Sequence, residues 1–278
     1  DPELDPDRWL DALRSGGLLH QVYEQTLREA KGRGVAMSDD AFEALALEAL
    51  AQGIARMRVE VPVPGEGALQ RETTARRNDV RSFVRMVRPR GAPWIALELA
   101  FGLADDEPVS IDVPGGTLRL RGAVDRVDED LSGLTVIDYK TGVPRAFAGT
   151  GTFDGGRRLQ HALYALVAEA RLRGTVVSGE YHFPTMRGQN EVAPFDRLRI
   201  AGVHGLLGHM LDGVASGSFV PTDKADDCMF CNFGDVCRAR DTGHLEMESP
   251  LAAWSEQHAN AGMWPAFASF KRVRTFEN

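Results

Sequence analysis

The sequence predicts an α/β fold in which helices flank a mixed central β-sheet, made of a β-meander plus one added strand. Three observations predict it. Apolar residues recur at helical spacing within residues 1–92, short runs rich in β-forming residues follow from Trp94, and helical and strand-like patterns alternate from residue 157. A purely parallel, doubly wound sheet would alternate strands and helices from the start, so this order of elements argues against it.

Three helices are expected before the sheet, at residues 9–31, 38–54 and 69–88. The first ends at Gly32, and the adjacent Gly16 and Gly17 form a candidate break near its start. The second begins after Ser38, where two aspartates in the first turn favour the positive end of the helix dipole. The third stops at Pro89, because proline cannot continue a helix.

The expected strands are short runs bounded by turn residues, at 95–102, 108–113, 117–128 and 134–139. Pro114–Gly116 predicts a hairpin turn between the second and third runs, and Asp130–Gly133 predicts a turn before the fourth. Consecutive runs joined by such short turns are typical of a meander. The added strand is expected at 175–183, with helices before and after it at 157–173 and 195–216.

The chain divides into three expected parts. Residues 1–92 form an N-terminal helical segment, residues 93–217 hold the sheet-containing core, and residues 218–278 form a C-terminal segment with all three cysteines. We expect this last segment to pack back on the N-terminal helices and to include a helix around Pro250–His258. The sequence starts without an initiator Met, so we expect it to be a processed or excised piece of a longer protein.

Composition and charge limit the classes of function. Hydrophobic residues make up 43% and charged residues 26%, as in soluble globular proteins. The formal net charge of −8 counts against a protein that coats nucleic acid, but not against an enzyme that gathers carboxylates around metal ions. The longest apolar stretch, from Trp94 to Leu103, is interrupted by Glu98 and is too short to cross a bilayer. The first residues of the sequence do not show the charged and then apolar pattern of a signal peptide. We therefore expect a cytoplasmic protein without membrane contact.

Basic residues nevertheless cluster in one segment, between residues 71 and 90. The arginines of this segment are Arg71, Arg76, Arg77, Arg81, Arg85, Arg88 and Arg90. They form either a solvated helix face or a stripe that faces phosphate groups, and the sequence leaves both readings open.

Two neighbouring strands carry carboxylates and a lysine. Asp138 and Lys140 lie two residues apart on one strand, so their side chains point to the same face. The turn between the strands can bring Asp125 opposite Asp138. Mg²⁺ prefers oxygen ligands, and a nearby lysine can stabilise developing negative charge. Since charged residues at the end of an apolar strand need a partner or a function, this group is a candidate metal site, and metal-assisted phosphodiester hydrolysis would explain its residue types.

These two strands resemble those of a known nuclease family. Gly122–Asp128 reads Gly-Ala-Val-Asp-Arg-Val-Asp, and Val136–Gly142 reads Val-Ile-Asp-Tyr-Lys-Thr-Gly. Both strings, and the interval of 13 residues from Asp125 to Asp138, are similar to the RecB/AddB-type nuclease domains of the PD-(D/E)xK superfamily. The resemblance implies a restriction-endonuclease-like core, Mg²⁺ or Mn²⁺ as cofactor, DNA as substrate, and a helicase domain or subunit as partner.

The resemblance extends to the first helix, where Gly16–Glu24 is similar to the family's Gly-x-Leu-x-His-x-x-x-Glu segment. The metal ligands that it implies are His20, Asp125, Asp138 and the carbonyl of Tyr139. It implies that Lys140 positions or activates the attacking water. Glu24 lies one helical turn after His20, on the same face, and is expected to support this ligand.

The helix after the lysine strand carries Gln160 and Tyr164, which share a face because they are four residues apart. They are similar to a Gln-x-x-x-Tyr motif of the family, which implies that they help to place the substrate. The alternative is that Tyr164 simply belongs to the core. Arg126 and Asp128 are expected to be structural.

The cysteines form a Cys-x₂-Cys-x₅-Cys group of Cys228, Cys231 and Cys237. Thiolates this close together suit zinc or an iron–sulfur cluster, whereas a disulfide framework would need an even number. The group resembles that of AddB-type nucleases, which implies a [4Fe–4S] cluster with a fourth cysteine before residue 9, where this sequence has none. Completion by His209 or His244 and three free thiols are the alternatives.

The predicted function is that of a metal-dependent DNA nuclease of the exonuclease type, within a helicase–nuclease that acts in double-strand-break repair. A catalytically inactive nuclease fold that binds DNA or a partner is the alternative, and the complete set of His20, Asp125, Asp138 and Lys140 argues against it. A sequence-specific endonuclease is disfavoured because the sequence has no evident recognition module.

Overall fold

The computed structural model describes residues 8–90, 94–147, 151–217 and 265–276, together with residues 219, 228, 231–233 and 236. The chain forms two compact units, each made of segments that lie apart in the sequence. The first unit comprises Asp1–Val109, Leu120–Thr150 and Gln160–Ile200. The second comprises Ser110–Arg119, Gly151–Leu159 and Ala201–Asn278.

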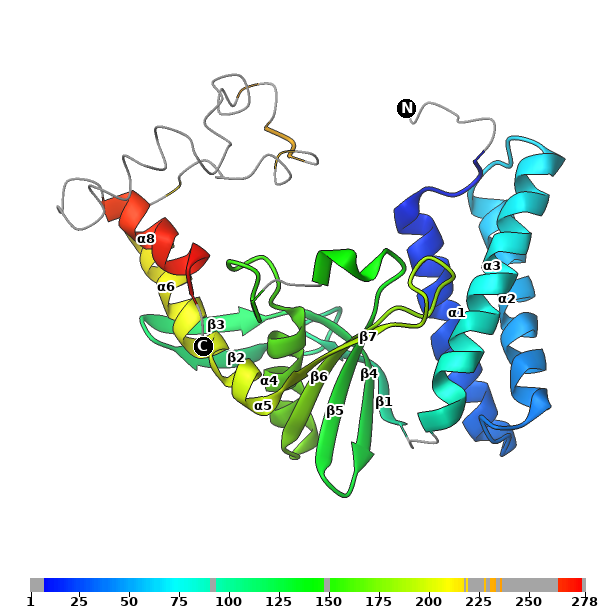
Figure 1. Cartoon of the computed structure of the whole chain (residues 1–278), viewed down its shortest axis with the longest axis horizontal. Coiled ribbons are helices and arrows are strands. Elements are labelled where there is room, and N and C mark those ends of the chain that lie inside the picture. Colours follow the sequence, from blue (N-terminus) through cyan, green and yellow to red (C-terminus); the bar gives the residue numbers. More distant parts are fainter. Residues whose placement is uncertain are drawn as a thin grey trace. The chain divides into compact units, whose positions relative to one another are not determined.

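The first unit begins with three long helices that run beside one another (Figure 1). They are α1 (Ala12–Arg33), α2 (Asp40–Glu60) and α3 (Glu66–Val87), and a short 3₁₀ turn, η1 (Arg88–Arg90), follows them. Asp11 caps α1 by accepting a hydrogen bond from the backbone N–H of Arg14, and Gly34 ends the helix in the left-handed conformation. The helix continues through Gly16 and Gly17, so the break considered at these glycines does not occur.

A five-stranded mixed sheet follows, and it confirms the predicted α/β class. Its strand order is β1-β4-β5-β6-β7. The strands are β1 (Trp94–Phe101), β4 (Gly122–Asp130), β5 (Gly133–Tyr139), β6 (Val176–His182) and β7 (Val192–Asp196). Only β5 and β6 pair in parallel, because helix α4 (Gln160–Leu172) lies between them in the chain and returns it to the same end of the sheet. The other neighbours are antiparallel.

Two helical layers cover the sheet. On one face, the core between α1–α3 and the strands centres on three aromatic rings: Tyr23 stacks on Phe83 at 4.1 Å between ring centroids, and Tyr139 meets Tyr23 edge-on at 5.2 Å. On the other face, α4 packs closely on β6, where a Cβ at Gly179 would lie 2.9 Å from the carbonyl oxygen of His161. The central strands are therefore packed on both faces by helices.

The predicted meander is wrong in one respect, because residues 117–128 form two strands in place of one. Strand β3 (Gly116–Leu120) pairs only with β2 (Val109–Val113) in a separate two-stranded sheet. This hairpin is an insertion, so β1 pairs directly with β4. The break falls at Arg121, just before Gly122, whose φ of 156° and close approach to the ring of Phe101 (3.0 Å from a Cβ placed there) disfavour a side chain.

The helix expected at 195–216 begins later than predicted. Residues Val192–Asp196 form the edge strand β7, and the helical part divides into α5 (Arg197–Ala201) and α6 (Val203–Ala215). Pro194 lies within β7, which an edge strand tolerates because one side of its backbone needs no sheet partner. A proline in the run had hidden this strand in the sequence.

In the second unit, α6 packs against α8 (Pro265–Arg274). The ring of Phe276 lies 3.3 Å from the position a Cβ would take at Gly205, which shows how tightly these segments meet. The helix expected around Pro250–His258 lies outside the described residues, and so does most of the cysteine segment, whose packing on the N-terminal helices stays a prediction. Among the described helices, none is both long and apolar enough to cross a lipid bilayer.

Candidate active site

A pocket of about 680 Å³ opens within the first unit, where α1 meets the ends of the strands and the start of α4. It is lined by Ala12, Leu13, Gly16, Gly17, His20, Gln21, Glu24, Glu98, Asp125, Asp138, Tyr139, Lys140, Thr141, Gln160 and Tyr164. All the residues of the first unit that the sequence singled out for catalysis or substrate placement are in this lining. Segments more than a hundred residues apart thus contribute to one cavity.

His20 reaches the strands from the middle of α1. Its Nε2 donates to the backbone carbonyl of Tyr139 at 3.0 Å, and its Nδ1 lies 3.5 Å from Oδ2 of Asp125. Burial lowers the pKa of His20, but the hydrogen bond and charge of Asp125, together with the charges of Asp138 and Glu98, outweigh burial and raise it above the ordinary value. The imidazole is therefore held in a strongly acidic environment.

Asp125 is the central carboxylate of the pocket. Its Oδ2 also accepts a hydrogen bond of 2.7 Å from the backbone N–H of Tyr139, on the neighbouring strand β5. This bond fixes the carboxylate at the point where the two strands meet. Because Tyr139 also accepts from His20, one peptide segment aligns both the acid and the imidazole.

Glu98, which sequence reasoning missed, lies beside them on β1. Its neighbours Leu97 and Leu99 pair with Arg126 and Val124 of β4, so Glu98 lies opposite Asp125. Its φ of 46° is left-handed, which is unusual for a residue with a side chain. Burial and the charge of Asp125 raise the pKa of Glu98 to about 7. The only signal in the sequence was an acid within an apolar strand.

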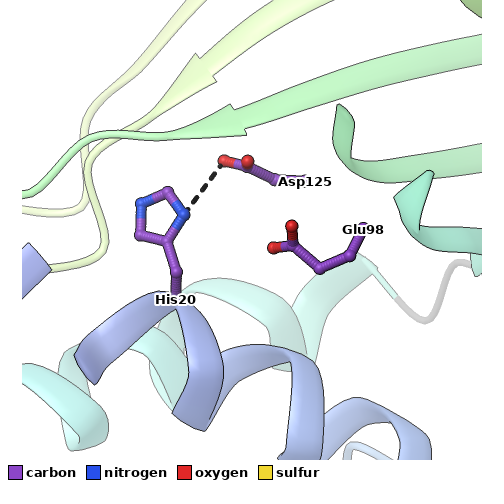
Figure 2. Close-up of side chains that lie close together, drawn as sticks. All are labelled: His20, Glu98 and Asp125. Atoms are coloured by element: carbon purple, nitrogen blue, oxygen red, sulfur yellow. Dashed lines mark ion pairs between the residues drawn. The ribbon is translucent and has the colours of Figure 1, made fainter. Parts of the chain in front are cut away.

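The three side chains form a group that can hold a cation. One ligand atom each from His20, Glu98 and Asp125 lies within 4.8 Å of the others. Figure 2 shows the imidazole on α1 pointing toward the two carboxylates on the strands, with a dashed line marking the ion pair with Asp125. Two carboxylates and one imidazole suit a hard divalent cation, and burial together with the charge of Asp125 raises the pKa of Glu98.

Asp138 and Lys140 form the adjoining part of the pocket. The Lys140 ammonium lies 2.5 Å from the buried Oδ2 of Asp138, so the two side chains form a close ion pair. Burial raises the pKa of Asp138 to about 6; the charge of Lys140 opposes this rise, and that of Asp125 adds to it. Asp138 lies outside the group of His20, Glu98 and Asp125, although it lines the same pocket.

Helix α4 supplies the polar wall next to Lys140. The Lys140 ammonium donates to Oε1 of Gln160 at 2.6 Å, and the amide of Gln160 donates to the hydroxyl of Tyr164 at 3.3 Å. Burial and the charges of Asp138 and Asp125 raise the pKa of Tyr164, so its hydroxyl stays protonated. The spacing of four residues predicted that Gln160 and Tyr164 share a face, and both line the pocket.

Glu24 also lines the pocket, one turn after His20. It forms an ion pair of 2.8 Å with Arg28, whose guanidinium also donates to the carbonyl oxygen of Leu97 at 3.0 Å. Glu24 therefore holds Arg28, which contacts the residue before Glu98, and no described hydrogen bond joins Glu24 to His20. Its carboxylate adds to the charges that raise the pKa of Glu98.

The arginines of α3 and η1 mostly bind nearby acids. Arg81 pairs with Glu43, Arg88 with Asp40, Arg76 with Asp79, and Arg90 with Glu180. These pairs favour the interpretation of the run as a structural, partly solvated helix face. Of the cysteines, Cys228 and Cys231 are free and joined by a backbone hydrogen bond, and Cys237 lies outside the described residues.

Comparison with known proteins agrees with this site. A family model described as the PD-(D/E)XK nuclease superfamily matches residues 2–238 of the 278. A search of curated proteins finds no match. The family match spans the helix of His20, the strands of Asp125 and Asp138, and the five-stranded sheet that holds them. The chain therefore belongs to the PD-(D/E)XK nuclease superfamily.

Proposed function

We propose that the chain is a metal-dependent DNA nuclease whose centre consists of His20, Asp125, Asp138 and Lys140, with Glu98 as a further ligand. The observation that carries the proposal is the convergence of an imidazole from α1 and two carboxylates from β1 and β4 within 4.8 Å. Asp138 and Lys140 open into the same pocket. Such an excess of acids around one cavity is costly unless a cation neutralises it.

The residues present fit a hard divalent cation. His20, Glu98 and Asp125 would hold it, and Asp138, which lines the same pocket, is a further proposed ligand. The Tyr139 carbonyl is a further proposed ligand; in this structure it accepts the N–H of His20. When bound, Mg²⁺ or Mn²⁺ polarises a phosphate oxygen and lowers the pKa of a bound water.

The proposed role of Lys140 is to orient the attacking water and to stabilise negative charge at the phosphate. Asp138 and Gln160 hold its ammonium from two sides, which fixes the amine without neutralising it completely. Tyr164 anchors Gln160 in turn. Glu24 keeps Arg28 in place beside the Glu98 strand. Arg126 and Asp128, on the opposite face of the sheet, have a structural role in this scheme.

The finer assignment is to an exonuclease of the RecB/AddB type, working with a helicase in the repair of double-strand breaks. The strings Gly122–Asp128 and Val136–Gly142 and the cysteine spacing support it. In the same scheme Cys228, Cys231 and Cys237 bind a [4Fe–4S] cluster that joins residues 218–278 to the helical segment 1–92, around the core 93–217. Visible absorption that disappears with Cys231→Ser would support the cluster, and a colourless, iron-free protein would contradict it.

The decisive experiment is cleavage of end-labelled single- and double-stranded DNA with Mg²⁺, with Mn²⁺ and with excess EDTA. We expect digestion that requires the metal and releases short products from the ends. Circular DNA should resist if the enzyme is an exonuclease. Cutting that persists in excess EDTA would contradict the metal-dependent mechanism. Binding of DNA without metal binding or cutting would favour the alternative, a catalytically inactive nuclease fold.

A further inference from the structure

Tyr181 continues the row of pocket acids onto the next strand of the sheet. It lies on β6, where it pairs in register with Asp138 of the parallel strand β5. Asp138 in turn lies opposite Asp125 of β4, because the adjacent residues Arg126 and Ile137 pair in register. Register partners point their side chains to the same face, so Tyr181 shares the face of these acids. It is only 1% exposed and does not line the pocket, so any effect on catalysis must pass through a neighbour.

The ring of Tyr181 faces the Lys140 ammonium, which lies 5.4 Å from the centre of the ring. This distance is within the range in which an aromatic face attracts a cation. The side chain of Lys140 is 27% exposed, so protein has replaced much of its water, and the attraction is screened less than at an open surface. Unlike the carboxylate of Asp138, the ring holds the ammonium without adding negative charge to the site.

The hydroxyl of Tyr181 fixes the start of helix α4. It accepts a hydrogen bond of 3.2 Å from the backbone N–H of His161, and it lies 3.0 Å from Nδ1 of the same residue. A hydroxyl can accept the N–H and donate its proton to Nδ1 at the same time. This N–H belongs to the first turn of α4, where the helix offers no carbonyl to accept it. The tyrosine thus satisfies the start of α4 from the neighbouring strand.

The turn that is fixed in this way carries a second support of Lys140. Gln160, the residue before His161, accepts the hydrogen bond of the ammonium at 2.6 Å. His161 is 1% exposed, and its ring stacks on Phe195 at 4.3 Å between centroids, so this turn has little freedom to shift. The position of Gln160 therefore depends on the hydroxyl of Tyr181. One side chain determines where two of the groups around Lys140 lie.

The alternative is that Tyr181 only fills the core. Phe147 packs on its ring at 4.7 Å between centroids, and Phe195 lies edge-on to it at 5.9 Å, so the residue also contributes to packing. Phenylalanine would make these ring contacts equally well. Packing therefore accounts for the ring but not for the hydroxyl, which costs free energy to bury unless its hydrogen bonds are made.

Resting on the proposed nuclease function, we propose that Tyr181 is a positioning residue of the catalytic centre, whose ring supports the Lys140 ammonium and whose hydroxyl fixes the helix start that carries Gln160. Tyr181 contacts neither the metal nor the DNA in this scheme and acts only through Lys140. Its loss therefore slows the chemical step and leaves the affinities for the divalent cation and for DNA unchanged.

The kinetic test compares Tyr181→Phe, which keeps the ring, with Tyr181→Leu, which removes it. We expect single-turnover cleavage at saturating Mg²⁺ to slow about threefold in Tyr181→Phe and about tenfold in Tyr181→Leu. Calorimetry should find the affinity for Mg²⁺ unchanged in both. In a Gln160→Ala background, Tyr181→Phe should slow cleavage no further, because the hydroxyl acts through Gln160.

Two variants match the losses of packing. Tyr23→Phe removes another buried hydroxyl, which donates to the carbonyl of Pro184 at 3.3 Å. Phe183→Leu removes a buried ring that contacts Phe147, as the ring of Tyr181 does. Both should cut within about twofold of the parent rate, because neither side chain faces the Lys140 ammonium in the part of the chain that the structure describes.

A spectroscopic test does not depend on cleavage. The chain has few lysines, which are Lys31, Lys140, Lys224 and Lys271. Labelling with ¹³C-lysine therefore gives few side-chain signals, and Lys140→Met identifies that of Lys140. The ring current of Tyr181 should move the ε-methylene protons of Lys140 upfield in the parent and in Tyr181→Phe, and the shift should vanish in Tyr181→Leu. The signal of Lys31, whose ammonium lies 4.2 Å from the centre of the Trp94 ring, should stay in place.

A Lys140 signal that does not move in Tyr181→Leu would overturn the inference. So would additive losses of rate in the Gln160→Ala background, or an equal loss in Phe183→Leu, since either result would mark a general loss of packing. Thermal melting checks the fold, and if Tyr181→Leu does not fold, the Tyr181→Phe cycle decides. A chain that never cuts DNA, but whose Lys140 signal moves in Tyr181→Leu, would refute the nuclease and leave the support of Lys140 standing.

Discussion

Strand β4 carries charged residues on both faces. The charges on one face are paired, and those on the other face belong to a group with an excess of acid. On the face toward α1–α3, Arg126 is fully buried and binds Asp128 through two contacts of 2.5 and 2.8 Å, and the Tyr139 hydroxyl accepts a further bond of 3.4 Å. On the other face, Asp125 joins two more carboxylates and an imidazole around an open pocket. Arg126 thus belongs to a neutralised pair, whereas its neighbour Asp125 belongs to a group with an excess of negative charge.

The difference shows how to separate structural charges from functional ones. The Arg126–Asp128 pair is complete: each charge has its partner, and its neighbours raise the pKa of Arg126 even though burial lowers it. The acidic group is incomplete, because burial and like charge raise the pKa of Glu98 to about 7 and that of Asp138 to about 6. Folding tolerates such an excess where a ligand from outside completes it.

The largest effect should come from removing a charge on the pocket face. Asp125→Asn and Asp138→Asn keep the size of the side chain but remove a ligand charge, and should lower the cleavage rate about 1,000-fold or more, on the order of 4 kcal/mol. Single-turnover cleavage of labelled DNA measures the rate, and circular dichroism checks the fold. Leu131→Ala, outside the pocket, should cut normally. Wild-type cleavage by Asp138→Asn would show that this face is not catalytic.

Removing a charge on the core face should change stability in place of activity. Asp128→Asn leaves the buried Arg126 without its carboxylate and should lower the free energy of unfolding by about 3–5 kcal/mol. Urea denaturation measures this value. Glu29→Gln breaks the exposed pair with Arg33 and should cost less than about 1 kcal/mol. Similar losses in Asp128→Asn and Glu29→Gln would mean that the buried pair has no special weight.

The pH dependence of stability should sharpen the contrast. Folding raises the pKa of Glu98 from 4.5 to about 7 and that of Asp138 from 3.8 to about 6. The folded protein therefore binds more protons than the unfolded chain in this range, and the stability contributed by protonation is lost as the pH rises toward 7. The raised pKa of His20 acts in the same direction, since its charged form stabilises the fold only at low pH.

Divalent metal should reverse this loss. In EDTA we expect the melting temperature to fall between about pH 5 and pH 8, and Mg²⁺ to raise it more at pH 8, where the carboxylates are already ionised. Glu98→Gln should melt higher than the parent in EDTA at pH 8 and gain less from Mg²⁺. A Mg²⁺ effect that is equal at both pH values and in Glu98→Gln would argue against Glu98 as a ligand.

The smallest effect concerns the support of Lys140. Gln160→Ala removes the carbonyl that accepts from its ammonium at 2.6 Å, and should lower the cleavage rate about tenfold while leaving metal affinity unchanged. Steady-state kinetics and metal titration by calorimetry separate the two quantities. Gln70→Ala, on the exposed side of α3, is the control. A loss of metal affinity in Gln160→Ala would assign Gln160 to the metal group and not to the lysine.

The sequence allowed prediction of the pocket residues that repeat at short, regular spacings. Asp138 and Lys140 alternate along a strand, and Gln160 and Tyr164 share a helix face, so their neighbours follow from geometry alone. The role of His20 could be predicted only through the family resemblance. Glu98 was missed, because the sequence shows only an acid within an apolar strand, and no nearby residue signals its left-handed backbone angle or its position opposite Asp125.

The fold class could be predicted from the sequence, but the pairing of the strands could be predicted less well. The apolar periods identified the helices and the central strands, but the pairing of β1 with β4 depends on the hairpin of β2 and β3 leaving the sheet. That choice is made by contacts between distant segments, such as the packing of Phe101 against Gly122. Local pattern favours a continuous strand across residues 117–128, and tertiary packing overrides it.

The interleaved order of the two units has a consequence for synthesis on the ribosome. Strand β7, at the edge of the five-stranded sheet, ends at Asp196, so the first unit remains unfinished until its last segment, Gln160–Ile200, has emerged. By then Ser110–Arg119 and Gly151–Leu159 have already emerged, although the unit they belong to is completed only by Ala201–Asn278. A single cut after Ile200 would keep the whole first unit in one fragment, but that fragment would also carry Ser110–Arg119 and Gly151–Leu159 without the rest of the second unit.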